Sequence, residues 1–376
     1  MYVPAEHGLP LTTLLDPCPA GMLPFPLSAP RHLYFYRARN AIYHAFRSLG
    51  FERGDTVLMP DYHNSNEVAA VRASGATVRF YRIGRNLEPD LEELGKLVRS
   101  TNARALFAIH YFGWAQPVKE LTALCDRHDM ILFEDCAMSL LSETLGQPLG
   151  SFGHFATYCL YKTLPVPNGG VLVQNQPGPS WLDGLQLEPC DLMTLGGRTL
   201  ELLLESLRGR AVIAGESAFA VKRTIGALLR LLRIDRVPFG DIGFDRDRAD
   251  VAISPLSLRL LQRFDYAEIK RRRRANFLRL RERLEGAVAL FPRELEAGMC
   301  PTIFPMLVAD KTAAAHALRA RGIQAMEFWN HGDPDADGAD ALFLREHLLE
   351  LPIHQDVTPG QVEFMAEQVQ RLRLKL

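Results

Sequence analysis

The chain has 376 residues, of which 47% are hydrophobic and 23% are charged, and its 43 lysines and arginines nearly balance 44 acidic residues. This composition excludes collagenous, coiled-coil and disordered proteins, and a formal net charge of -1 argues against a general nucleic-acid binder. No apolar run approaches the roughly 18 residues of a membrane-spanning helix, and the first residues lack the pattern of a signal peptide. We therefore expect a cytoplasmic protein without a transmembrane segment, long enough for two domains.

The six cysteines are scattered and form no C-x-x-C pair. This spacing favours neither a metal finger nor a disulfide framework, and it is typical of a protein in a reducing compartment. We predict no metal site.

Residues 1–33 are rich in proline and show little periodicity, so we expect an irregular lead-in. From there to about residue 175, segments with helical spacing of apolar residues alternate with short apolar runs. The expected helices cover residues 40–50, 67–75, 91–100 and 117–129, and the expected strands cover 56–60, 76–81, 104–112, 130–135, 154–161 and 169–175. This alternation predicts βαβ units and a mostly parallel, buried sheet.

The segment 195–236 is different, because it is long, helical in pattern and basic. We expect an inserted pair of helices that packs on the body of the protein or on a partner subunit. The pattern also fits a helix that binds a membrane surface or an acidic partner, and the sequence does not decide between these interpretations.

From about residue 254 the pattern predicts one long helix that contains the charge run Lys270–Arg274. Five consecutive helical residues point in all directions around the axis, and we interpret the run as a solvated face and not as a nucleic-acid site. Further segments predict a small α+β domain; they cover residues 302–308, 311–322 and 359–374. The expected layout is a lead-in over 1–33, a large α/β domain over 34–250 with the helical insert, and a small C-terminal α+β domain over 251–376.

Several residues that can carry chemistry follow predicted strands, where ligands bind in open α/β sheets. His110 follows one strand, Glu134 and Asp135 end the next, and Lys162 follows the strand 154–161. Asp135 alone would be an ordinary turn residue, and His110 alone an ordinary packed histidine. Lys162 lies between an aromatic strand and a Pro/Gly-rich turn, a setting in which burial can make a lysine a nucleophilic amine. A lysine and an aspartate in one cleft are the minimal protein groups of a pyridoxal-phosphate enzyme.

The chain also resembles the DegT/DnrJ/StrS-type sugar aminotransferases over most of residues 35–375. The resemblance rests on motifs that occur in the family's order: "AFRSLGFERGDTVLMPDY" (45–62), "ASGATVRFY" (73–81), "IHYFG" (109–113), "LFEDCAM" (132–138), "GSFGH" (150–154), Lys162 followed by Gly169 and Gly170, and "LELPIHQDVTPGQVEFM" (349–365). It implies the fold type I of pyridoxal-phosphate-dependent transferases, with a mostly parallel sheet flanked by helices and a smaller C-terminal α+β domain.

The resemblance implies a role for each of several residues. Lys162 would bind pyridoxal 5'-phosphate covalently and shuttle a proton, and Asp135 would keep the pyridine nitrogen protonated. The other expected cofactor-binding residues are Thr157, Arg39 and Asn40 at the phosphate, His63 over the ring, His110 nearby, and Met138, which stands where the family has glutamine.

The implied reaction is a ping-pong transfer through a Schiff base, in a homodimer that serves sugar or polysaccharide biosynthesis. The amino donor would be glutamate or glutamine, and the acceptor a keto compound, most simply a nucleotide-linked keto-sugar. Three positions depart from the family: Met138, the pair Ala38–Arg39 in place of Gly-Thr, and the segment 250–253 in place of an N-x-R-M motif. Two alternatives therefore stay open, another pyridoxal-phosphate reaction on this scaffold, or a non-catalytic binding protein that kept the fold.

Overall fold

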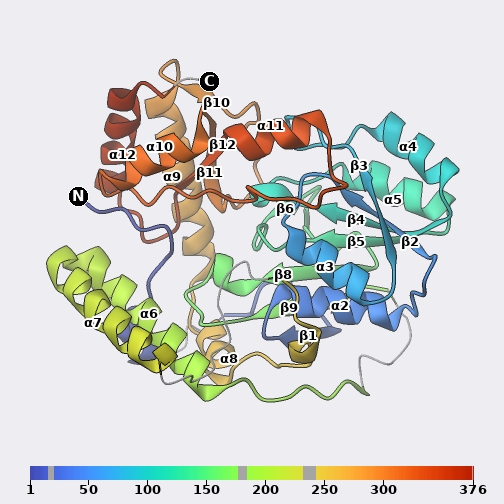
Figure 1. The fold of residues 1–376 in the computed structure, drawn as a ribbon, viewed down its shortest axis with the longest axis horizontal. Helices are drawn as coiled ribbons and strands as arrows, with labels where there is room; N and C mark the ends of the chain where they lie inside the picture. The colour runs from blue at the N-terminus through green and yellow to red at the C-terminus, as the bar shows by residue number, and fades with distance from the viewer. Residues whose placement is uncertain (16–20, 177–183, 232–242, 375) are drawn as a thin grey trace.

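The computed structural model describes residues 1–15, 21–176, 184–231, 243–374 and 376. A large central sheet contains strands β1 (His32–Phe35), β2 (Thr56–Pro60), β3 (Thr77–Tyr81), β4 (Ala103–Ile109), β5 (Ile131–Asp135), β8 (Phe155–Cys159) and β9 (Gly170–Gln174). Their order is β1-β9-β8-β5-β4-β2-β3 (Figure 1). A short two-stranded sheet, β6 (Glu143–Thr144) and β7 (Gln147–Pro148), follows β5.

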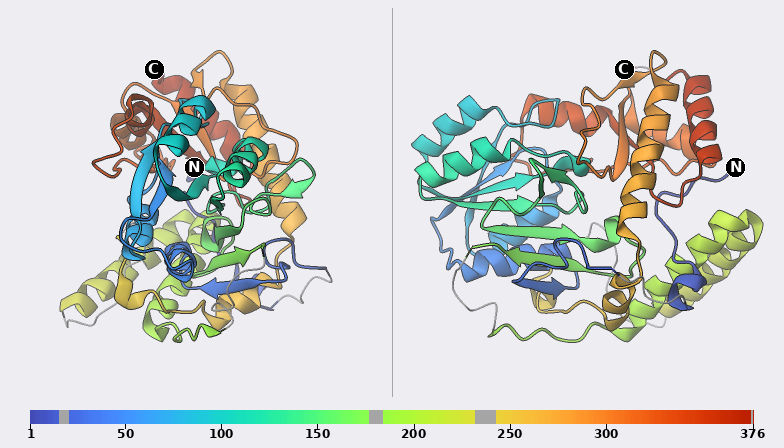
Figure 2. Two further views of the ribbon diagram at one scale, coloured as in Figure 1. Left: turned by 90° about the vertical axis from the view of Figure 1, so that its right-hand side faces the viewer. Right: turned by 180° about the vertical axis from the view of Figure 1, so that it is seen from behind.

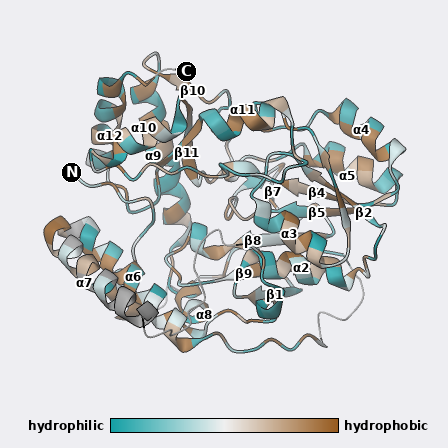
Figure 3. Cartoon of the chain, viewed as in Figure 1, coloured by the Kyte–Doolittle hydropathy of each residue, from teal (hydrophilic) through white to brown (hydrophobic). Residues whose placement is uncertain are grey.

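The central sheet is mainly parallel, as predicted. Strands β3, β2, β4, β5 and β8 pair in parallel, whereas β9 is antiparallel to both β8 and β1. Every residue of β8 and β9 is buried, including the polar Thr157 and Gln174, and Figure 3 shows the hydropathy of the chain in the same view.

The four predicted helices of this region are confirmed as α2 (Ala38–Ser48), α3 (Ser65–Ala73), α4 (Leu91–Ser100) and α5 (Val118–Arg127). Side-chain caps set two of their starts, because Asn64 accepts from a backbone N–H of α3 and Asp90 does the same for α4. The strand predicted over 104–112 is shorter than expected. It ends at Ile109, and a 3₁₀ turn over Tyr111–Gly113 follows.

The helical insert is a pair of helices, α6 (Leu192–Arg210) and α7 (Val212–Leu231), that pack on each other and project from the body (Figures 1 and 2). The last part of the predicted segment, 232–236, lies outside the described residues. Among the helices of the described residues, none is long and apolar enough to cross a membrane.

The single long helix predicted from residue 254 is wrong. Two helices occur there, α8 (Pro255–Leu261) and α9 (Tyr266–Leu284), and the side chain of Asp265 caps the start of the second. The charge run lies on α9 as expected, and Arg271 and Arg272 are exposed. Arg273, however, is only 1% exposed, so the interpretation of the run as a solvated face fails at this residue.

A second sheet near the C-terminus contains β10 (Ala289–Leu290), β11 (Ile303–Leu307) and β12 (Leu348–Pro352), accompanied by α10 (Lys311–Arg319), α11 (Ala339–His347) and α12 (Pro359–Leu372). The lead-in contains a short helix, α1 (Leu11–Leu15), and Val3 bridges to Ile323 beside this sheet. One large buried apolar cluster includes residues of both sheets. The domain limits at residues 33 and 250 stay a prediction.

Candidate active site

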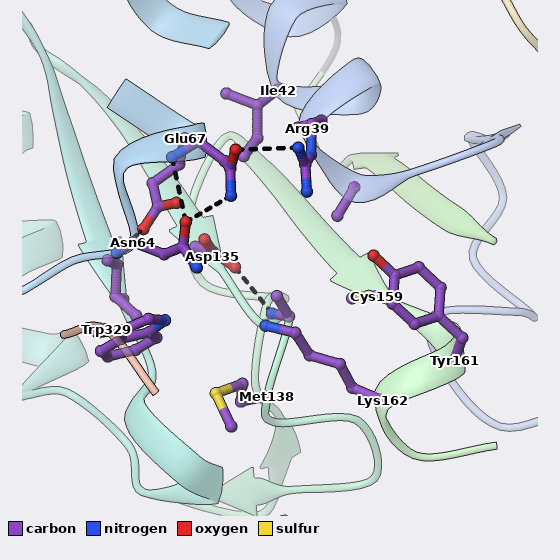
Figure 4. Close-up of a pocket in the computed structure, with 14 residues that line it drawn as sticks. Arg39, Ile42, Asn64, Glu67, Asp135, Met138, Cys159, Tyr161, Lys162 and Trp329 are labelled. Atoms are coloured by element: carbon purple, nitrogen blue, oxygen red, sulfur yellow. Dashed lines mark hydrogen bonds between the residues drawn. The ribbon is translucent and has the colours of Figure 1, made fainter. Parts of the chain in front are cut away.

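A pocket lies at the carboxyl ends of β4, β5 and β8, which we call the lysine pocket (Figure 4). Its walls come from the start of α2, the start of α3, the ends of the three strands and one distant loop. The lining residues are Ala38, Arg39, Ile42, Asn64, Asn66, Glu67, Ile109, Asp135, Ala137, Met138, Cys159, Tyr161, Lys162 and Trp329. Four residues predicted from the sequence are thus together in one pocket: Lys162, Asp135, Arg39 and Met138.

Asp135 and Lys162 provide the central pair of polar groups. Asp135 is the last residue of β5, and its Oδ1 accepts the N–H of Ala137 at 2.8 Å. Burial raises the pKa of Asp135, and the Ala137 N–H and the charge of Lys162 oppose this rise. Lys162 ends a 3₁₀ turn directly after β8, and Figure 4 shows its side chain reaching toward Asp135. No hydrogen bond or ion pair within the described part of the chain engages the Lys162 amine, which leaves it available to a ligand.

The glycine pair after Lys162 allows α2 to begin beside the pocket. A Cβ on Gly170 would lie 2.3 Å from the carbonyl carbon of Arg37, so only glycine permits this approach. The first N–H groups of a helix have no intrahelical partners and attract anions. Arg39 adds a positive charge at the same place, and its Nη1 donates to Asn66 at 2.9 Å.

Glu67 lies in the same pocket and was not among the residues predicted from the sequence. Its Oε1 accepts the N–H of Asn64 at 2.7 Å, which completes a capping box at the start of α3. Burial, reinforced by the nearby charge of Asp135, raises the pKa of Glu67 from 4.5 to about 8. The side chain is therefore a neutral acid at neutral pH. The N-x-x-E spacing of Asn64 and Glu67 was a readable signal for the cap, although not for the pocket.

Trp329 contributes an aromatic wall from the loop between α10 and α11. Its ring stacks on Phe112 at 5.5 Å and meets the rings of Tyr62 and Tyr111 edge-on. Its carbonyl accepts from Arg345 at 2.8 Å, which holds the loop against the central sheet. No local sequence signal marks this tryptophan, because its position depends on how the two sheets pack.

Thr157 and Asn40, both predicted at the phosphate, do not line the lysine pocket. The Thr157 hydroxyl is buried and donates to the carbonyl of Val171 at 3.2 Å. The Asn40 amide donates to the carbonyls of Arg248 and Ala249, at 2.8 and 3.0 Å. Both side chains thus bind the surrounding backbone, and their cofactor contacts stay a prediction.

His63, predicted over the cofactor ring, also lies outside the pocket lining. Its ring stacks on Phe80 at 5.0 Å, its Nδ1 donates to the carbonyl of Pro60, and its Nε2 accepts the N–H of Asp333. Burial lowers its pKa to about 4, so the ring is neutral. The neighbouring residue, Asn64, faces the pocket in its place.

His110 belongs to a buried hydrogen-bond network and does not line the pocket. Its Nδ1 accepts the N–H of Gln116, so Nε2 carries the proton and donates to Glu134 at 2.9 Å. Glu134 also accepts three backbone N–H groups of the "GSFGH" turn. Cys136 lies close to both side chains, but burial raises its pKa well above the ordinary value, and the other two donors are engaged in hydrogen bonds. The hydrogen bonds of Glu134 thus connect β5 to the turn over residues 150–154, and the absence of a metal site stays a prediction.

A second cavity of about 230 Å³ adjoins the lysine pocket, and we call it the arginine chamber after Arg273, which lines it. The two cavities share five residues: Asn64, Met138, Tyr161, Lys162 and Trp329. The remaining lining residues are Arg273 on α9, residues 5–7, 302–303 and 352–354, and Met326 and Phe328. A group bound at Lys162 would thus face both cavities.

Comparison with known proteins agrees with this geometry. Residues 37–179 match the model of the DegT/DnrJ/EryC1/StrS aminotransferase family. The chain is 30% identical over 138 residues to GDP-perosamine synthase of Vibrio cholerae, and 31% identical over 144 residues to the dTDP-3-amino-3,4,6-trideoxy-alpha-D-glucose transaminase of Streptomyces venezuelae. These alignments cover 36% and 37% of this chain, and 37% of the length of each relative.

The likeness in structure extends further than the likeness in sequence. Helicobacter pylori PseC, an aminotransferase involved in the biosynthesis of pseudoaminic acid, superposes with a TM-score of 0.65 at 15% identity, covering 99% of both chains. DesV of S. venezuelae superposes with a TM-score of 0.63 at 19% identity, covering 92% of this chain and 85% of its own. By sequence, residues 37–179 thus resemble the DegT/DnrJ/EryC1/StrS aminotransferase family, and over most of its length the chain has the fold of these two solved aminotransferases.

Proposed function

We propose that this chain is a pyridoxal-phosphate-dependent aminotransferase. It would move an amino group from an amino acid, glutamate or glutamine, to a keto acceptor such as a nucleotide-linked keto-sugar. The observation that carries the proposal is the lysine pocket, in which the Lys162 amine faces the buried carboxyl group of Asp135 between a helix N-terminus and an aromatic ring.

The chemistry of the lining residues fits pyridoxal phosphate. The Lys162 amine suits its aldehyde, and Asp135 suits the pyridine nitrogen. Arg39 and the first N–H groups of α2 suit the phosphate, and Trp329 provides a flat wall beside the ring. When bound, this cofactor supplies an electron-withdrawing ring that stabilises negative charge on the carbon that carries the amino group.

The chain's own residues would then do three things. Asp135, ionised beside a cationic ring, would hold a proton at the pyridine nitrogen. Lys162 would bind the cofactor in the resting enzyme and, once displaced by substrate, would carry a proton to and from the substrate carbon. The His110–Glu134 network would keep β5 and Asp135 in position, because both side chains are completely buried and hydrogen-bonded.

The nucleotide-linked keto-sugar acceptor is supported by the relatives named above, because the names of two of them are those of enzymes that form or convert nucleotide-linked amino sugars. The arginine chamber gives space for such an acceptor beside Lys162. The homodimer and the cytoplasmic location stay predictions from the sequence.

A non-catalytic binding protein is the second candidate. It is favoured by the position of Thr157, whose hydroxyl binds the sheet instead of the pocket, and by Met138, an apolar residue where the family has a polar one. A site with weak phosphate contacts would retain the fold and lose turnover.

Absorption spectroscopy separates the two candidates. Purified protein is mixed with pyridoxal phosphate, and the visible band of lysine-bound cofactor is recorded before and after addition of L-glutamate. We expect the band to form, to bleach with glutamate, and to be absent in Lys162→Ala but present in Lys119→Ala, an exposed lysine on α5. A wild-type band that glutamate, glutamine and other amino acids all leave unchanged would favour the binding protein. Absence of any band that depends on Lys162 would refute the use of this cofactor.

A further inference from the structure

The helix α6 turns charged side chains toward the body of the protein. Arg198 and Leu202 are buried on this side, and Arg198 pairs with Glu6 at 2.5 Å. The carboxylate of Glu205 accepts the hydroxyl of Tyr2 at 3.1 Å. Polar contacts to the N-terminal segment thus hold this side of α6 in place.

The opposite side of α6 exposes large apolar residues, and we call it the outer face. Met193, Leu200 and Leu207 are each between 40% and 46% exposed. They are seven residues apart, which is about two helical turns, so they share one face. Leu200 and Leu207 are two positions away from Leu202 and Glu205, respectively, and therefore lie about 200° around the axis from them. A surface helix ordinarily exposes its charged side chains, and α6 instead exposes leucines.

The exposed apolar residues continue at the end of the pair that projects from the body (Figures 1 and 3). Here α6 ends at Arg210 and α7 begins at Val212, and we call this joint the tip. Val212 is 41% exposed and Ile213 is 85% exposed. The residues 206–215 include two arginines and no acidic residue. Leu207 lies about one turn before the joint, so the outer face reaches the tip.

The two helices also differ in charge from the rest of the chain. They contain six basic and three acidic residues, namely Arg198, Arg208, Arg210, Lys222, Arg223 and Arg230 against Glu201, Glu205 and Glu216. Their net charge is +3, whereas the whole chain has -1 and its remaining residues therefore have -4. Positive charge beside an exposed apolar helix face is typical of helices that bind the surface of membranes with acidic lipids.

The size of the outer face favours lipid over a protein partner. From Met193 to Leu207 it is about 21 Å long, and a helix is about 10 Å wide, so it offers on the order of 200 Å². A standard protein interface buries about 800 Å² of each partner, and this face alone would not hold a second chain. Among the described helices, none can cross a membrane, so the pair would lie on the lipid surface.

We propose that the α6–α7 pair docks this protein on the surface of a membrane that contains anionic phospholipids. The outer face of α6 and the tip contact the lipid, and the excess positive charge of the pair lies beside the acidic headgroups. The contacts of Arg198 and Glu205 with the N-terminal segment fix the pair relative to the body. This docking goes beyond the proposed reaction and does not depend on it.

Flotation of the full-length protein with lipid vesicles tests this proposal. The vesicles contain phosphatidylcholine alone, or phosphatidylcholine and phosphatidylglycerol in equal parts, at low and at high sodium chloride. No cofactor or substrate is present, so a failure of the aminotransferase proposal is a separate result. The variant combines Leu200→Gln with Leu207→Gln, because glutamine is a good helix former. The matched control combines Leu278→Gln on α9 with Leu342→Gln on α11, two leucines of similar exposure.

We expect wild type to bind vesicles with phosphatidylglycerol at least about tenfold more strongly than vesicles without it, since each basic residue near an anionic surface contributes about a factor of five. High salt should remove this preference. The Leu200/Leu207 variant should bind at least about tenfold more weakly, because its leucines no longer enter the lipid, and the control should bind as wild type. If this variant does not fold, Ile213→Gln at the tip decides, and it should also weaken binding.

Three results would overturn the proposal. One is a wild type that binds neither kind of vesicle, or both kinds equally. Another is equal binding by wild type and the Leu200/Leu207 variant, which would mean that a different surface contacts the lipid. The third is an oligomer that wild type forms without lipid and the Leu200/Leu207 variant does not form in sedimentation velocity. In that case a second copy of the chain covers the outer face.

Discussion

Glu67 links the electrostatics of the lysine pocket to the pH dependence of folding. Its folded pKa of about 8 lies above the ordinary value of 4.5. The folded protein therefore holds this proton more tightly than the unfolded chain does. Below pH 4.5 the folded and the unfolded protein both carry the Glu67 proton, and the contribution of this group to the free energy of unfolding is fully present. As the pH rises from there to about 8, the unfolded chain releases the proton and the free energy of unfolding falls by about 1.4 kcal/mol per pH unit.

The variant Glu67→Gln removes this ionisation and keeps an oxygen for the N–H of Asn64. The rise in the pKa of Glu67 from 4.5 to about 8 corresponds to a loss of at most about 5 kcal/mol in the free energy of unfolding at high pH. Rearrangement of the protein around the ionised carboxylate reduces this loss. Relative to wild type, Glu67→Gln should therefore gain stability with rising pH, by about 3 kcal/mol between about pH 5.5 and about pH 8. Glu350, whose pKa burial also raises to about 8, is present in both proteins and cancels in the comparison.

Urea unfolding followed by tryptophan fluorescence measures this difference at several pH values, without added cofactor. Glu120→Gln, a change in the exposed first turn of α5, is the control and should follow wild type. A difference between Glu67→Gln and wild type that stays constant across the pH range would refute the reasoning, because it would mean that Glu67 ionises as easily in the folded protein as in the unfolded chain.

Two further changes test the walls of the lysine pocket. Gly170→Ala would place a Cβ 2.3 Å from the Arg37 carbonyl carbon and push the start of α2 away, so we expect a lower thermal midpoint and at least about tenfold weaker binding of pyridoxal phosphate in a spectral titration. Gly196→Ala on α6 is the control, because a Cβ there meets nothing within 4 Å, and it should be neutral or stabilise the protein by up to about 1 kcal/mol. Equal behaviour of the two variants would contradict the close approach of Gly170 to the Arg37 backbone. Trp329→Ala should cost about 3–5 kcal/mol in urea unfolding, whereas Trp329→Phe, which can still stack on Phe112, should cost less; equal costs would show that the ring contacts are unimportant.

The sequence predicted those parts of the molecule that depend on local pattern. Apolar runs separated by helical segments indicate a parallel sheet, and the position directly after a strand indicates its ligand-binding edge. Asp135 and Lys162 follow their strands immediately, so both could be assigned to one cleft. Arg39 came instead from the family resemblance, which places phosphate contacts at the start of this helix, and it also lines the pocket.

The remaining site residues depend on information that is not local. Five consecutive charged residues do not reveal which one faces inward, and the break before Asp265 sets the rotation of α9 that buries Arg273. Trp329 reaches the pocket only because the second sheet packs beside the first. At His63 the prediction was one residue away from the side chain that faces the pocket, Asn64, and one residue in a loop is enough to turn a side chain to the other side.

The segment before α1 connects the arginine chamber to the helical pair. Glu6 forms a wall of the chamber and pairs with Arg198 on α6, and the N–H of Leu9 donates to the carbonyl of Leu202 at 2.9 Å. Deletion of α6 and α7 as a surface appendage would thus also release the wall that these contacts hold. Loss of substrate binding in such a truncated protein would report on the anchoring of Glu6, and it would not show that the helices themselves contact a substrate.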